Sequence, residues 1–133
     1  SKKKYMKIEV STGEIFDKLS ILEIKKRKIK DLDKLKNIQI EYDLLKLASL
    51  NFLPIYDSGL SFLYIDLQQV NFKLWEIEDS LRDLERENKY YSREFSELAR
   101  SVYFYNDKRS SIKNKINILT NSKIVEEKSY KKY

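Results

Sequence analysis

Apolar residues along the chain recur at intervals of three and four, the period of an α-helix that packs along one side. The sharpest run starts after Gly59 and lapses at Asn88. Its members are Leu60, Leu63, Leu67, Val70, Leu74, Ile77, Leu81 and Leu84. The pattern predicts a long helix over 60–89 with a coiled-coil-like apolar seam.

A second long pattern follows a polar and aromatic hinge. Ser92 is a suitable N-cap and residues 120–122 (Thr-Asn-Ser) a suitable end, so we expect a helix over 92–120. Its apolar positions are Phe95, Leu98, Val102, Tyr105, Ile112, Ile116 and Leu119, and Arg109 interrupts their register. Because the connection is short, the two helices are expected to fold back antiparallel.

The first half of the chain predicts a short extended segment over 6–10, where apolar and charged residues alternate. Ser11 can cap the following helix, and Glu14 is placed to reach back to the cap as in a capping box.

A second N-terminal helix can be capped by Asp31 or Asp33, but no glycine or proline forces a break there. Residues 11–50 therefore form either one helix or two. Residues 51–59, which contain Pro54, predict a loop.

Composition narrows the fold class. Two glycines and one proline are too few for the many turns of a β-sandwich or barrel. We expect an all-α protein: one domain over 1–133, built as an antiparallel bundle of three to four helices.

The charge of +6 is concentrated at the two ends of the chain. Residues 1–10 carry +3 and residues 122–133 carry +2, which leaves +1 for the 111 residues between them. We expect basic, flexible ends over 1–7 and 123–133, with the C-terminal tail ordered where it docks on a protein partner. Nucleic-acid binding is not expected, because the central region shows no single basic face, despite the cations at 25–30.

The sequence contains no cysteine and no histidine, which excludes thiol and imidazole nucleophiles and the usual zinc ligands. No metal, cofactor or catalytic residue is predicted. The longest weakly charged stretch, 47–65, is too interrupted for a membrane span, and no signal peptide is expected. We therefore expect a cytoplasmic protein.

The candidate chemistry lies in polar stripes beside the two long seams. One stripe is Asn71, Trp75, Glu78 and Arg82; the other is Ala99, Tyr103, Asn106, Ser110, Lys113 and Asn117, flanked by Arg100 and Asp107. If the helices pack antiparallel, the stripes meet beside the core. The simpler interpretation is a solvated boundary layer, in which Glu78 and Arg82 form an ordinary i,i+4 pair.

The alternative interpretation is a recessed anion site for a phosphate or carboxylate. Its candidate ligand-binding residues are Arg82, Arg100, Tyr103, Asn106 and Lys113. Asn71, Trp75, Glu78 and Asp107 would support them.

Four separated strings resemble an uncharacterised family of small proteins from bacteria and their phages. They are IEVSTGEIFDKLSILEIK (8–25), VN with LWEIED (70–79), LARSVY with ND (98–107) and the C-terminal EEKSY (126–130). The resemblance implies a link to surface-polysaccharide metabolism and assigns no functional residue. Because the strings include residues of the polar stripes as well as leucines, the resemblance favours the interpretation of the stripes as a recessed anion site.

Two functions are therefore expected. The first is a non-enzymatic helical adaptor or assembly protein, a homodimer through its long helices. The alternative is a small-ligand-binding protein or enzyme that acts on a phosphorylated sugar or nucleotide-sugar through the polar stripes.

Overall fold

The computed structural model describes residues 4–129 and is all-α, with no strand in that range. The elements are α1 (Thr12–Lys28), α2 (Leu32–Ser49), the 3₁₀ helix η1 (Leu50–Ser58), α3 (Leu60–Arg86) and α4 (Arg93–Leu119). Four α-helices pack together, as the sequence predicts. The two longest helices match the predicted hairpin to within a few residues at each end.

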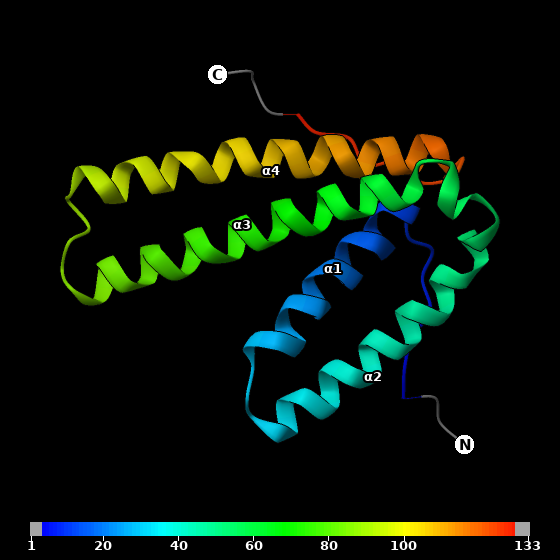
Figure 1. The fold of residues 1–133 in the computed structure, drawn as a ribbon, viewed down its shortest axis with the longest axis horizontal. Coiled ribbons are helices and arrows are strands. Elements are labelled where there is room, and N and C mark those ends of the chain that lie inside the picture. Colours follow the sequence, from blue (N-terminus) through cyan, green and yellow to red (C-terminus); the bar gives the residue numbers. More distant parts are fainter. Residues whose placement is uncertain (1–3, 130–133) are drawn as a thin grey trace.

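The long hairpin α3–α4 lies along one side of the molecule (Figure 1). Its turn depends on Asn88, which adopts a left-handed φ of 58°. The N–H of Lys89 then donates to the carbonyl of Leu84 at 2.8 Å and closes the end of α3. Ser92 caps α4 by accepting the N–H of Phe95, as expected.

Helix α1 is the centre of the bundle. It packs against α2, α3 and α4, whereas α2 contacts only α1 and η1 among the described elements and lies at the edge (Figure 1). The buried core joins α1, α3 and α4 through Phe16, Leu19, Leu60, Tyr64, Leu67 and Ile116. Phe16 meets Tyr64 edge to face, with ring centroids 5.5 Å apart.

Residues 11–50 form two helices, which settles the alternative left open by the sequence. Asp31 makes the break, because its Oδ1 accepts the N–H groups of Asp33 and Lys34 and caps α2. The loop predicted over 51–59 is wrong in its local structure, since Leu50–Ser58 winds as a 3₁₀ helix. 3₁₀ turns frequently connect α-helices, but this one is longer than most, with nine residues. Gly59 ends it with a left-handed φ of 113°.

The apolar seam of α3 is covered within the protomer. Six of its eight members are buried, and Leu63 and Leu81 are half-buried. The sequence predicts a homodimer through the long helices. Because the seam of α3 is already covered, such a dimer would have to form through another surface. Within residues 4–129, no helix combines the length and the apolar character needed to cross a membrane.

Candidate functional site

The two polar stripes meet at a cavity of about 530 Å³ between α1, α3 and α4. Cavities of this size commonly hold small molecules. Its lining residues are Ile21 from α1, Asn71, Leu74, Trp75, Glu78, Asp79 and Arg82 from α3, and Val102, Asn106 and Arg109 from α4.

The buried polar residue of the lining is Asn71, which is 4% exposed. Its Nδ2 donates to Oδ1 of Asp17 at 2.8 Å and to Oγ of Ser20 at 2.6 Å. Ser20 in turn donates to the carbonyl of Asp17 at 2.7 Å. Asn71 is therefore fixed by α1 through both N–H groups of its amide, which leaves the amide oxygen as its only group for a ligand.

The outer lining combines an aromatic ring with charges of both signs. Trp75 is half-buried, and Arg82 lies 4.0 Å from Glu78 across one helical turn. Arg109 is half-buried and forms no ion pair with any residue between 4 and 129. The guanidinium of Arg109 is thus available to an anion that enters from solvent.

Behind Asn71 lies a charged centre built on Lys113, whose side chain is 13% exposed. Its Nζ is 2.8 Å from Glu14, 3.7 Å from Asp17 and 3.2 Å from Glu126. Burial disfavours the ammonium, but the hydrogen bond to Glu14 and the nearby carboxylates outweigh it and raise the pKa of Lys113. Burial also opposes ionisation of Glu14, yet Lys113 lowers the pKa of that carboxyl.

The charged centre exists because the first turn of α1 lies directly against α4. The N–H of Gly13 donates to Oδ1 of Asn117 at 2.7 Å, and that of Thr12 to Oγ of Ser122 at 3.2 Å. Ser11 caps α1 by accepting the N–H of Glu14, as predicted. The predicted return contact from Glu14 to the cap is replaced by its ion pair with Lys113, which is the stronger partner.

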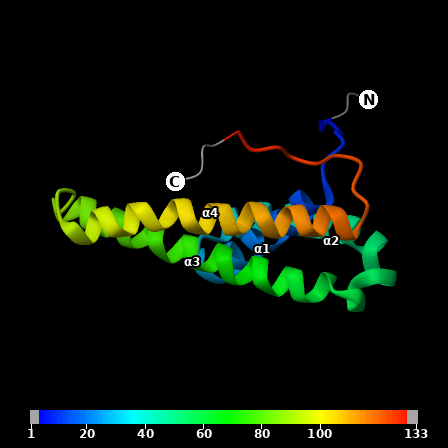
Figure 2. The same ribbon diagram turned by 90° about the horizontal axis from the view of Figure 1, so that it is seen from above.

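The segment after α4 turns back and runs along that helix (Figures 1 and 2). Asn121 makes the turn with a φ of 53°, and Glu126 then reaches Lys113. Within residues 123–129 the tail expected to dock on a partner thus contacts its own chain. Tyr130 of the EEKSY string, and the rest of the end through residue 133, lie outside the described residues.

The cavity brings together five of the residues singled out from the sequence: Asn71, Trp75, Glu78, Arg82 and Asn106. Lys113 is excluded from it by its carboxylate partners. Arg100, Tyr103 and Asp107 are exposed on the outer side of α4, about 60° or more beyond the arc that faces α3. The residues of the anion site predicted from the sequence therefore do not form one site. Some line the cavity, Lys113 belongs to an ion-pair network, and the others are exposed to solvent.

Sequence reasoning missed the contributions of Arg109, Asp17 and Ser20. Arg109 was visible as the residue that breaks an apolar register, and such a break can mark a residue turned toward a cavity. Asp17 and Ser20 stand with Gly13 and Ile24 at 4-3-4 spacing, which places polar groups on a buried helix face. Nothing in one sequence shows that Asn71, 54 residues away from Asp17, meets that face.

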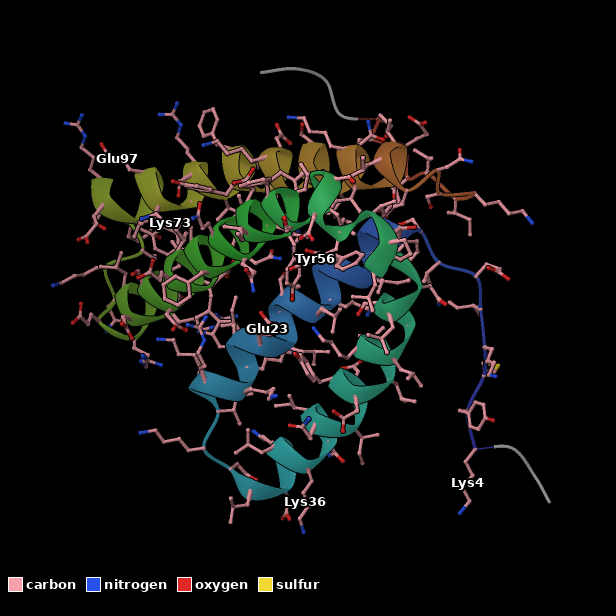
Figure 3. The ribbon with its side chains drawn as sticks, turned by 45° about the vertical axis from the view of Figure 1, so that its right-hand side comes forward. Lys4, Glu23, Lys36, Tyr56, Lys73 and Glu97 are labelled. Carbon is pink, nitrogen blue, oxygen red and sulfur yellow. The ribbon has the colours of Figure 1, made fainter. Side chains whose placement is uncertain are left out.

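A second cavity of about 590 Å³ lies between α1 and α3, and several of its polar lining residues already have partners within the protein. Glu23 lies on the side of α1 that faces α3 (Figure 3) and accepts a hydrogen bond from Gln68. The cation of Arg27 stands over the ring of Phe72 at 5.5 Å. Among residues 4–129 no group of acidic side chains is arranged to hold a metal ion.

The model of a family of unknown function (DUF6165) matches residues 6–133, nearly the whole chain. No curated protein and no solved structure matches it.

Proposed function

The chain belongs to the DUF6165 family, whose function is unknown, and we propose that it binds a phosphorylated sugar or nucleotide-sugar in the cavity between α1, α3 and α4. One observation carries the proposal: Arg82 from α3 and Arg109 from α4 line the same cavity as Trp75 and the buried amide of Asn71.

The lining supports this ligand class through its mixture of groups. Two guanidinium groups can hold a phosphate by paired N–H donors. The carboxylates of Glu78 and Asp79 accept hydrogen bonds from hydroxyl groups, and the amide of Asn106 can accept or donate. Asn71 can only accept, through its amide oxygen, because both of its N–H groups are engaged by Asp17 and Ser20. The ring of Trp75 offers an apolar face for a sugar or base. Because the lining contains two carboxylates as well as two cations, it should bind a phosphorylated polyol more tightly than a bare anion. The hydroxyl groups of the polyol can pair with the carboxylates.

A thermal-shift titration tests the proposal. The probes are glucose, inorganic phosphate, glucose 1-phosphate and UDP-glucose, each raised to millimolar concentration. Saturation at ten times Kd stabilises the fold by about 1.4 kcal/mol, or roughly 5 °C for a domain of this size. We expect this shift with glucose 1-phosphate or UDP-glucose, and a smaller one or none with either fragment alone.

Arginine variants locate the binding. Arg82→Gln and Arg109→Gln should each weaken the shift, and the pair should abolish it. Arg100→Gln is the matched control, because that side chain is exposed on α4 outside the cavity. A flat titration, or equal loss in the control, would contradict the proposal.

A second proposed function is the non-enzymatic adaptor or assembly role expected from the sequence. It is supported by the outer face of α2, where Ile40, Leu44 and Leu47 are 62%, 66% and 66% exposed. Self-association measured by light scattering tests it.

A further inference from the structure

Helix α2 has two apolar faces, and the described fold uses one. Ile38 is buried, and Tyr42 and Leu45 pack against the core through α1 and η1. On the opposite side Leu32, Ile40, Leu44 and Leu47 are 62–75% exposed, and no other described element contacts α2 there. Ile40, Leu44 and Leu47 are neighbours at helical spacing, and exposed apolar patches of this kind often mark interaction sites.

The exposed face contains a symmetric order of residues. Leu32, Lys36, Ile40, Asp43 and Leu47 follow one another at spacings of four, four, three and four, which places them on one side of the helix. On each side of Ile40 this series contains one charged residue and then one leucine. The charges are of opposite sign, a cation toward the start of α2 and an anion toward its end.

We propose that this face is the interface of a homodimer, in which two α2 helices pack antiparallel about a two-fold axis that passes between Gln39 and Ile40. In this arrangement Ile40 packs beside its own copy next to the axis. Lys36 lies opposite the partner subunit's Asp43, and Leu32 opposite the partner subunit's Leu47. Both ion pairs form at once because a two-fold interface repeats every contact.

Charge and area both favour a second copy of this chain as the occupant. With Asp33 included, the charges on the face sum to −1, whereas an anionic membrane surface attracts faces with a basic excess. Lys36 points away from α1 into solvent (Figure 3). The apolar side chains expose on the order of 500 Å² per protomer, so two faces with their polar margins approach the ~1,200 Å² of small specific interfaces.

Sedimentation equilibrium of the full chain between 5 and 200 µM tests the proposal. We expect a dimer for the wild type and for Ile118→Glu, a matched control on α4 that is 71% exposed. Ile40→Glu should raise the dimer Kd by ~100-fold or more. Circular dichroism should show unchanged helicity, because Ile40 contributes nothing to the packed core.

A charge swap tests the two-fold register. Lys36→Asp should weaken the dimer by ~10-fold, because it places like charges opposite each other twice. Adding Asp43→Lys should restore the wild-type Kd to within ~3-fold. A monomeric wild type at 200 µM, a dimer indifferent to Ile40→Glu, or a swap without rescue would each overturn the proposal. Sedimentation of a monomeric chain with phosphatidylserine vesicles would assign the face to a membrane and overturn it as well.

The dimer proposal rests on the assembly role proposed above. Its results are independent of the ligand proposal, because α2 contributes no residue to the cavity between α1, α3 and α4.

Discussion

The backbone N–H of Gly13 donates to Oδ1 of Asn117 at 2.7 Å, joining residues that are 104 positions apart. A Cβ on Gly13 would lie 2.6 Å from the carbonyl oxygen of Lys113 and 3.0 Å from Oδ1 of Asn117. Only glycine therefore allows α1 to approach the α4 backbone this closely. The approach sets Glu14 and Asp17 beside Lys113.

Gly13→Ala should accordingly cost about 3 kcal/mol of unfolding free energy, because the methyl group collides with backbone and displaces a buried hydrogen bond. Urea unfolding measures the cost. Gly59→Ala is the contrasting variant: its Cβ meets nothing closer than 3.9 Å, so only its left-handed φ is strained, at about 1 kcal/mol. A smaller cost at Gly13 than at Gly59 would contradict the close approach.

The pKa shifts of the charged centre predict how stability depends on pH. The pKa of Glu14 is lowered, so its contribution is complete above 4.5 and is lost as the pH falls through the lowered value. The pKa of Lys113 is raised, so its contribution is complete below 10.5 and is lost as the pH rises through the higher value. From this pair we expect a constant urea midpoint between pH 6 and 9 and a decline below pH 4.5.

Replacement of Lys113 should destabilise the protein less at acidic pH than at neutral pH. Lys113→Met leaves the buried carboxylate of Asp17 and the half-buried one of Glu14 without their cation and should cost about 3 kcal/mol at pH 7. In this variant acidification protonates Glu14 and relieves the cost, so the difference from the wild type should shrink toward pH 4. Lys128→Met, which removes an exposed lysine beside Glu126, is the control. A cost independent of pH would contradict the ion-pair interpretation.

Asn71 and Asp17 form a pair whose chemistry can be exchanged. Asn71→Asp places a second carboxylate 2.8 Å from that of Asp17. At pH 7 it should lower the free energy of unfolding by about 3 kcal/mol or more, the cost expected for an unpaired buried charge. The double variant Asp17→Asn/Asn71→Asp restores one donor and one acceptor and should recover more than half of the loss. Chemical denaturation of the three variants gives the coupling energy; strictly additive costs would contradict a direct contact.

Most of the fold is predictable from local patterns in the chain. Ser11, Ser92 and the alternating three and four spacing of the leucines act within a turn or two of helix, so one sequence contains the whole signal. The break at Asp31 is ambiguous because the competing states, one helix or two, differ only in a cap. The 3₁₀ winding of Leu50–Ser58 depends on packing of Phe52 and Ile55 against the core, which local propensity does not register.

Only part of the candidate site is predictable from the sequence, chiefly the residues contributed by α3. Helical spacing correctly groups Asn71, Trp75, Glu78 and Arg82, because residues on one helix keep fixed angles to one another. The rotation of α4 against α3 decides which of its polar residues face inward, and this rotation turns Tyr103 outward and Arg109 inward. The contact between Asp17 and Lys113 depends on tertiary packing of α1 against α4, which no spacing within one helix encodes.

Ligand binding in the cavity is the central claim, and Trp75 tests it most directly because it is the only tryptophan in the chain and lines that cavity. The measurement is the emission of Trp75 during titration with glucose 1-phosphate or UDP-glucose. We predict a saturable change in emission for the wild type and for Arg100→Gln, and none for the double variant Arg82→Gln/Arg109→Gln. A ligand that stabilises the protein without altering Trp75 emission, or an unchanged titration in the double arginine variant, would contradict the account.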